Sequence, residues 1–289
     1  MEAVRSMLFT PGNRPDLVAK AMRSGTDAVI VDLEDAAPVA SKQQARDALA
    51  ELDIGEVPVF VRVNGGDTDF LWPDVAAAGR ADIAGIVLPK ADDPELLRRM
   101  DGALTVLELE CGREVGSTAL LPLLESGLGI VRINELLTSS PRVESVLFGS
   151  GEEGDLVVDL GCEWTPEGTG LLTARSLVLL AARAAGIEQP LDAVFMDYRN
   201  LDALRTECEL AKRVGYVGKV AIHPAQVPVI HDVFTPTDEE VVYQRDLLEK
   251  FEAALAEGSA SIGVNGRMVD YAVARRARQI LARAAAARR

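Results

Sequence analysis

Charged and polar residues directly follow the short apolar segments of this 289-residue sequence. Glu125 comes after Leu120–Leu124, and Glu34 and Asp35 come after Ala28–Leu33. Other segments end on, or lead to, Arg62, Asn64, Lys90, Glu152, Glu153, Asp155, Asp197 and His223. Any one of these residues can simply mark where a strand leaves the core. As a set they predict a shared site, because a charge beside a buried segment is costly unless it has a partner.

Several carboxylates gathered at one place repel one another, and a bound cation relieves that repulsion. The candidate ligands are oxygens, with no cluster of His and Cys residues. Mg²⁺ or Mn²⁺ is therefore favoured over zinc. The alternative, an ion-pair network of Arg62 and Lys90 with these acids and without a metal, stays open.

The elements that carry these residues alternate between apolar, β-branched segments and longer amphipathic stretches. The apolar segments are Met7–Thr10, Ala28–Leu33, Val57–Val63, Ile83–Leu88, Leu120–Leu124, Ser145–Phe148, Leu191–Met196 and Val217–Ile222. Such alternation predicts a parallel sheet built of βαβ units. About eight units favour a closed (β/α)8 TIM barrel over an open doubly wound sheet. In a barrel the carboxyl ends of all strands lie at one rim, where catalytic groups sit.

The length suits one barrel with sequence to spare. We expect residues 1–233 to form the barrel and residues 234–289 to form a C-terminal helical extension. The extension contains a Gly- and Ser-rich break at 258–263 and an Ala- and Arg-rich helix over 272–289. A barrel does not need this extension, which we expect to cover the active site, to pack on a neighbouring subunit, or both.

Composition excludes several classes of protein. The formal net charge is −15, from 30 basic and 45 acidic residues, which argues against nucleic-acid binding. The three cysteines, Cys111, Cys162 and Cys208, are odd in number, far apart and without a Cys-x-x-Cys motif, which argues against a zinc site or a disulfide framework. The N-terminal residues lack the pattern of a signal peptide, and no apolar segment is long enough to span a membrane. We therefore expect a cytoplasmic protein.

The sequence resembles the HpcH/HpaI aldolase and citrate lyase family over almost its whole length. Within that family it is most similar to the branch of citrate lyase β-subunits and citrate-lyase-β-like acyl-CoA lyases. The shared motifs are Arg5–Pro15, Asp32–Ala36, Val61–Asn64, Leu88–Lys90, Leu123–Ser126, Asp155–Gly161, Thr165–Gly168, Gly218–Pro224 and Asn265–Asp270. Their number and order identify the family but not the substrate.

The resemblance implies a Mg²⁺-dependent lyase that acts as a homotrimer or a multiple of one. It implies that Glu125 and Asp155 bind the metal and that Arg62 holds the substrate carboxylate or the developing enolate oxygen. The resemblance implies further roles for five residues. Glu34 and Asp35 would hold metal-bound waters, Phe9 and Lys20 would contact coenzyme A, and Asp270 would reach a neighbouring subunit's active site as an acid or base.

The segment before Asp155 departs from the family pattern. Family members have Gly-Ala-Glu-Asp or Gly-Gly-Glu-Asp there, whereas this chain has Phe148-Gly-Ser-Gly-Glu-Glu-Gly-Asp155, with an apparent insertion. Counting back from Thr165–Gly168 assigns the ligand to Asp155, and Glu152 or Glu153 stays open as a further ligand. The usual Thr after the fifth strand's Glu is Ser126 here. These departures beside the expected metal site indicate an unusual substrate.

The leading expectation is retro-Claisen cleavage of a β-hydroxyacyl-CoA, such as a malyl-, citramalyl- or citryl-thioester, into an acyl-CoA and a 2-oxo acid. A malate-synthase-like or malyl-CoA thioesterase activity would use the same enolate chemistry. A third reading is an aldolase acting on small 2-keto acids without coenzyme A, which the region of Lys20 and the extension argue against. A fourth is a citrate lyase complex subunit acting on acyl-carrier-protein thioesters.

Overall fold

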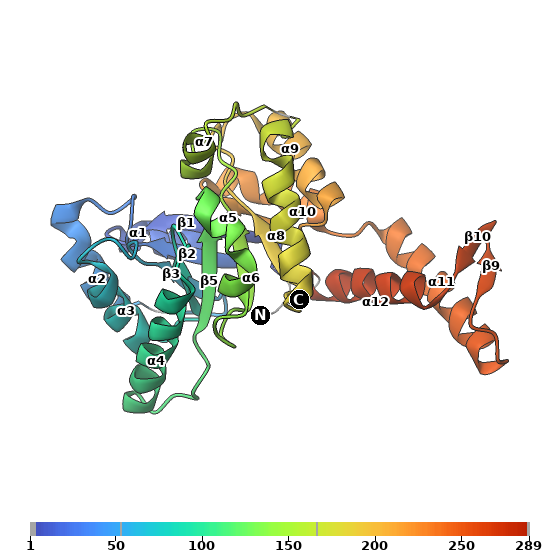
Figure 1. Ribbon diagram of the computed structural model, residues 1–289, viewed down its shortest axis with the longest axis horizontal. Coiled ribbons are helices and arrows are strands. Elements are labelled where there is room, and N and C mark those ends of the chain that lie inside the picture. Colours follow the sequence, from blue (N-terminus) through green and yellow to red (C-terminus); the bar gives the residue numbers. More distant parts are fainter. Residues whose placement is uncertain (1–3, 53, 166, 288–289) are drawn as a thin grey trace. The chain divides into compact units, whose positions relative to one another are not determined.

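The computed structural model of the protein describes residues 4–52, 54–165 and 167–287 (Figure 1). Pro166, within the motif at 165–168, and the last two residues of the expected helix over 272–289 lie outside the described residues. The chain divides into two compact units. The first extends to His231 and the second begins at Asp232.

Eight parallel strands close into a barrel in the first unit, in the order β1 to β8. The strands are β1 (Ser6–Pro11), β2 (Ala28–Asp32), β3 (Val59–Arg62), β4 (Gly85–Leu88), β5 (Ala119–Leu124), β6 (Ser145–Phe148), β7 (Gln189–Asp192) and β8 (Gly218–Ala221). The barrel interior is filled by apolar side chains, among them Met7, Phe60, Leu121 and Leu191. The predicted (β/α)8 TIM barrel is therefore confirmed.

Helices follow the strands around the barrel (Figure 1). They are α1 (Pro15–Met22), α2 (Lys42–Ala50), α3 (Leu71–Arg80), α4 (Pro94–Glu110), α5 (Gly127–Val131), α6 (Ile133–Leu137), α7 (Asp155–Leu160), α8 (Leu172–Ala184), α9 (Leu201–Val214) and α10 (Val227–Phe234), with short 3-10 turns η1 (Val39–Ser41), η2 (Thr169–Leu171) and η3 (Pro224–Gln226). Sequence reasoning had not picked out α3 or α7. No helix in the described part of the chain is long and apolar enough to cross a membrane.

The seventh strand is shorter than the sequence predicted. The apolar segment Leu191–Met196 indicated a strand ending at Asp197, but β7 ends at Asp192. The side chain of Asp192 is buried, and the apolar residues after it, such as Val194 and Met196, line a cavity instead of continuing the strand. The expectation that Asp197 marks the strand end was wrong, because hydrophobicity alone does not distinguish strand pairing from cavity lining.

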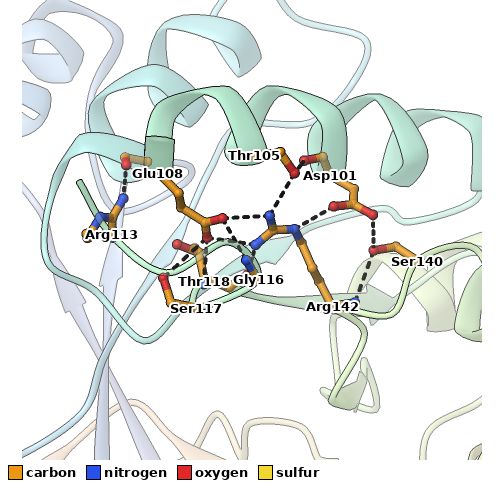
Figure 2. A network of polar contacts seen from close by, with 10 residues as sticks. Asp101, Thr105, Glu108, Arg113, Gly116, Ser117, Thr118, Ser140 and Arg142 are labelled. Carbon is orange, nitrogen blue, oxygen red and sulfur yellow. Dashed lines mark hydrogen bonds and ion pairs between the residues drawn. The ribbon is translucent and has the colours of Figure 1, made fainter. Parts of the chain in front are cut away.

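Arg142 organises a buried polar network at the amino ends of β5 and β6 (Figure 2). Its guanidinium donates to both carboxylate oxygens of Glu108 at 2.7 Å, and its Nε donates to Asp101. The remaining bonds go to the Thr105 hydroxyl and the Thr118 carbonyl. This network ties α4 to the barrel at the end opposite the strands' carboxyl termini, the end that serves stability in such barrels.

The second unit contains α11 (Asp238–Ala256), the hairpin of β9 (Ile262–Val264) and β10 (Arg267–Val269), and α12 (Tyr271–Ala286). Asn265 and Gly266 make the hairpin turn, both with positive φ, as two-residue turns between antiparallel strands require. Phe251, Leu247, Val264 and Val269 form part of a separate apolar core in this unit.

Candidate metal-binding active site

A cavity of about 620 Å³ lies at the carboxyl ends of the barrel strands. Its wall combines apolar side chains of the barrel with polar residues from the strand ends. The residues singled out from the sequence that line it are Phe9, Asp35, Arg62, Glu125, Glu153 and Asp155. Residues up to 146 positions apart in sequence are thus brought to one place, because parallel strands deliver their carboxyl ends to the same rim.

Glu125 is held at the end of β5 by the backbone of a neighbouring loop. Its Oε1 accepts a hydrogen bond of 2.8 Å from the N–H group of Lys90. Lys90 has φ of 47°, a left-handed conformation that is uncommon for a residue with a side chain and is often found at functional sites. Burial raises the pKa of Glu125 to about 7, against the opposing effects of the Lys90 N–H group and Arg62.

Asp155 begins α7, directly after the segment that departs from the family pattern. Its side chain is 53% exposed, and one carboxylate oxygen lies 3.5 Å from Lys90 Nζ. Lys90 therefore contacts both predicted ligands, Glu125 through its backbone and Asp155 through its side chain. Glu153 also lines the cavity, whereas Glu152 is exposed and does not.

Arg62, the last residue of β3, is fixed by three neighbours. Its Nε and Nη2 donate to the two carboxylate oxygens of Asp32 at 2.7 and 2.6 Å, and its Nη1 lies 2.9 Å from Glu34 Oε2. The guanidinium carbon lies 4.6 Å from the centre of the Phe9 ring, a cation–π contact. Burial would lower the pKa of Arg62, but Asp32 and Glu34 outweigh it and raise that pKa, so the cation is permanent.

Glu34 and Asp35 lie on the loop after β2, and both lie near the guanidinium of Arg62. Burial raises the pKa of Glu34 to about 7; the carboxylates of Asp35 and Glu125 add repulsion, and Arg62 offsets only part of these effects. Asp35 is 76% exposed, with Oδ2 3.7 Å from Arg62. Lys42 secures this loop by donating to the carbonyl oxygens of Leu33 and Glu34.

The charges of this rim fit a divalent cation. Carboxylates outnumber the cations Arg62 and Lys90, the acids being Asp32, Glu34, Asp35, Glu125 and Asp155. The ion pairs expected for a metal-free network do form, yet the pKa values of Glu34 and Glu125 still rise to about 7. Burial is the main cause of that rise, and neighbouring carboxylates add to it. A cation bound by Glu125 and Asp155 would favour the ionised form of these acids.

No group of three or more His, Cys, Asp and Glu side chains that could hold a metal occurs among the residues that the structure describes. Mg²⁺ ordinarily takes one or two protein carboxylates and completes its octahedron with water and substrate oxygens. Glu125 and Asp155 are a donor set of that kind.

Three of the predicted site residues are not among the residues that line the cavity: Glu34, which reaches Arg62 from the loop after β2, Lys20 and Asp270. Lys20 is an exposed residue near the end of α1. Asp270 belongs to the second unit, where its carboxylate caps α12 by accepting from the N–H groups of Ala272 and Val273. The cap uses Oδ1 of Asp270 in both hydrogen bonds.

Sequence reasoning missed Asp32 as a site residue, although it lay within a quoted motif. Asp32 pairs in register with Arg62 across β2 and β3, and its carboxylate also accepts from the N–H groups of Glu34 and Ala36. Opposite charges at the ends of consecutive apolar segments were the available signal. A second missed feature is the buried pair of Asp192 and Lys219 on β7 and β8, signalled by a lysine within an apolar segment.

The amino-acid sequence matches two family descriptions. Residues 5–224 match the HpcH/HpaI aldolase/citrate lyase family. Residues 176–287 match a family described as C-C bond lyase of the TIM-barrel fold. The first match covers the barrel strands and every residue that lines the cavity.

The sequences of several named proteins are similar to nearly the whole chain. Citrate lyase subunit beta of Escherichia coli K12 is 38% identical over 284 residues, covering 97% of this chain and 93% of that protein. L-malyl-CoA/beta-methylmalyl-CoA lyase of Cereibacter sphaeroides is 32% identical, covering 97% and 94%. A crystal structure of CitE from Mycobacterium tuberculosis in complex with magnesium, acetoacetate and coenzyme A has a TM-score of 0.78 and 30% identity, covering 98% of each chain.

Proposed function

The chain belongs to the HpcH/HpaI aldolase/citrate lyase family and is a magnesium-dependent carbon–carbon lyase of CoA esters, and we propose that it cleaves a β-hydroxyacyl-CoA by retro-Claisen chemistry. The products are an acyl-CoA and a 2-oxo acid. The observation that carries this proposal is the meeting of Arg62, Glu125 and Asp155 around one cavity at the strand ends.

Arg62 stabilises the negative charge that develops during cleavage. As the hydroxyl proton leaves, the C–C bond breaks, the hydroxyl carbon becomes the carbonyl of the 2-oxo acid, and the bonding electrons form a thioester enolate. The guanidinium of Arg62 is permanently charged and held by Asp32, Glu34 and Phe9, so it needs little reorganisation to meet that enolate. Such preorganised charge is often the largest contribution to catalysis.

We assign Glu125 and Asp155 as the protein ligands of Mg²⁺, with Mn²⁺ as a substitute. When bound, the cation polarises the substrate's hydroxyl and carboxylate oxygens as a Lewis acid. Lys90 keeps the two ligands in place, since its N–H group binds Glu125 and its ammonium group pairs with Asp155. Glu34 and Asp35 would hold the waters that complete the cation's shell.

The proton transfers require an acid or base that can reach the substrate. We propose Asp270 for this role, supplied by the extension of a neighbouring subunit in a homotrimer. Its carboxylate sits at the amino end of α12 as a helix cap, so its position is well defined. Phe9 and Lys20 remain the proposed contacts for coenzyme A, and the cytoplasm remains the proposed location.

An assay of the purified chain with Mg²⁺ tests the proposal. A panel of malyl-, citramalyl- and citryl-CoA is offered, and 2-oxo acid and free coenzyme A are measured separately. We expect a 2-oxo acid and an intact acyl-CoA from at least one thioester. Free coenzyme A released in step with turnover would instead show a malate-synthase or thioesterase activity. Absence of cleavage of every thioester would contradict the proposal.

A second candidate is a citrate lyase complex subunit acting on acyl-carrier-protein thioesters. The 38% identity to a citrate lyase β-subunit over nearly the whole chain favours it. The same acyl group presented on coenzyme A and on an acyl carrier protein separates the two candidates. A carrier-bound substrate cleaved at least about tenfold faster, a difference of 1.4 kcal/mol in barrier, would favour the complex subunit.

A further inference from the structure

A buried cluster of four charged side chains lies beneath α8 and α9, on the outer side of the barrel wall. Asp192 at the end of β7 pairs with Lys219 of β8, Nζ to Oδ2 at 2.8 Å, and Lys219 also lies 2.9 Å from Glu207 of α9. Arg175 of α8 lies 3.1 Å from Asp192. Two cations and two carboxylates thus balance, and all four side chains are at least about 95% buried.

Burial of so many charges is not by itself stabilising, because desolvation offsets the attraction between them. Burial would also raise the pKa of Asp192, but Lys219 and Arg175 outweigh it and hold that pKa below its ordinary value. Asp192 is therefore a fixed, ionised acceptor inside the fold. Asp192 has no part in the proposed cleavage reaction.

One hydrogen bond leads from this cluster toward the cavity. The hydroxyl of Ser150, which is fully buried, lies 3.1 Å from Asp192 Oδ1 and donates to it. The carbonyl oxygen of the same residue accepts from Trp164 Nε1 at 3.2 Å. Ser150 is thus anchored by both its side chain and its backbone, within the segment 149–154 that connects β6 to α7.

The same segment touches both proposed metal ligands. Gly149 packs so closely that a Cβ placed on it would be 2.7 Å from Glu125 Cβ, and its N–H group donates to Leu124 O. At the other end, Gly154 N bonds to Gly151 O just before Asp155 begins α7. Glycines at 149, 151 and 154 offer no side chain to anchor, and Glu152 and Glu153 are exposed.

We propose that Ser150, held by the buried carboxylate of Asp192, is a positioning residue that sets the placement of Asp155 relative to Glu125 for the divalent cation. This inference rests on the metal ligands assigned under the proposed function. It also gives a purpose to the unusual Gly149-Ser-Gly-Glu-Glu-Gly154 sequence, in which the inserted residues need an internal anchor.

The test is a titration of the full chain with Mn²⁺, with free Mn²⁺ followed by electron paramagnetic resonance, beside Tm measurements. Ser150→Ala should weaken Mn²⁺ binding by about tenfold or more, the usual effect of losing a group that orients a metal ligand. Its Tm should fall by no more than about 4 °C. Saturating Mg²⁺ should restore most of kcat. Ser150→Cys, which keeps a donor of similar shape but donates weakly, should have a Mn²⁺ affinity between those of wild type and Ser150→Ala.

Glu108→Gln in the Arg142 network is the matched control, since it disrupts a buried ion network at the other end of the barrel. It should lower Tm and leave Mn²⁺ affinity unchanged. If Ser150→Ala binds Mn²⁺ as tightly as wild type, the role of Ser150 is wrong, while the metal assignment stands. The same conclusion follows if Glu108→Gln weakens Mn²⁺ binding as much as Ser150→Ala does. A wild-type chain that binds no divalent cation would overturn the metal assignment and this inference with it.

Discussion

At the rim of the barrel, Glu125 has the N–H group of Lys90 on one side and Gly149 on the other. Arg62 lies between Asp32, Glu34 and the ring of Phe9. Each of these two candidate site residues is therefore positioned by neighbours from other strands and from the loops that follow them. The pKa values of Glu125 and Glu34 are both raised, mainly by burial. A positive charge placed near these two acids would therefore stabilise their ionised forms.

Glu125→Gln should remove the activation by Mg²⁺, because the amide keeps the shape of the side chain but not its charge. We expect kcat/KM to fall by more than about 100-fold, beyond the usual effect of losing an outer partner of a metal ligand. Asp35→Asn changes an exposed residue that would hold only metal-bound water, so it should lower kcat/KM by about tenfold at most. Rates measured over a Mg²⁺ series check both variants. A Glu125→Gln enzyme still fully activated by Mg²⁺ would contradict the ligand assignment.

Among the elements, the connection between β6 and α7 packs its backbone at Gly149 directly against Glu125. Gly149→Ala would bring a methyl group within 2.7 Å of Glu125 Cβ and 3.0 Å of Leu124 O, so backbone has to move. We expect a loss of about 1–3 kcal/mol in the free energy of unfolding and at least a tenfold loss in activity. Urea denaturation and steady-state rates measure the two effects.

The control for that substitution is Gly102→Ala on α4, where no atom lies within 4 Å of the added Cβ. An alanine in an exposed helix interior should raise the free energy of unfolding by up to about 1 kcal/mol. Activity should stay at the wild-type level. Equal losses of activity in the two variants would mean that the packing of Gly149 against Glu125 has no special role.

The contact between α4 and the barrel carries a pH dependence. Burial opposes ionisation of Glu108, but Arg142 and the N–H groups of Gly116 and Thr118 lower its pKa to about 2. The unfolded value is about 4.3, so the stabilisation is complete above that pH and is lost as pH falls toward 2. Glu108→Gln should cost roughly 3 kcal/mol at pH 7, because it leaves Arg142 buried without its charged partner.

Urea denaturation at a series of pH values from 7 to 3 measures this effect. The difference between wild type and Glu108→Gln should shrink as the pH drops below about 4.3. Glu95→Gln on the same helix removes an exposed ion pair with Arg98 and should cost less than about 1 kcal/mol at any pH. A difference for Glu108→Gln that stays constant down to pH 3 would refute the depressed pKa.

For the whole molecule, the proposed trimer predicts complementation between two inactive variants. A Glu125→Gln chain lacks a metal ligand and an Asp270→Asn chain lacks the proposed acid or base. If Asp270 serves a neighbouring subunit, mixed trimers contain sites in which an intact Glu125 meets an intact Asp270. Co-expressed chains should therefore recover part of the activity, roughly a quarter of the sites for random mixing of chains across independent interfaces.

Light scattering gives the oligomeric state in the same preparation. No recovery in mixed oligomers, although each variant assembles, would place Asp270 in its own chain's site or outside catalysis. Asp270→Asn that turns over at the wild-type rate would remove its catalytic role altogether. An amide keeps one acceptor oxygen for the cap of α12, so the helix should remain folded.

The sequence by itself was enough to predict the barrel and the family, and it indicated a set of polar residues at one rim as the candidate site. Strand–helix alternation and polar residues at segment ends are local patterns, and the motifs around Glu125 and Arg62 are contiguous in the chain. Only the tertiary structure decided which charges neutralise one another. Asp32 meets Arg62, and Asp192 meets Lys219, through strand register across 30 and 27 residues.

The reason is that a charge's partner depends on which elements are neighbours, and sequence separation does not reveal that. Asp197 looked like a strand end because Leu191–Met196 is apolar, while Asp192 is the acid that the fold buries. Ser150 looked like one residue of an insertion, and the role we propose for it rests on its hydrogen bond to Asp192. Local pattern therefore indicated the candidate site, and long-range packing determined which of its acids pair with Arg62 and which are proposed to bind a cation.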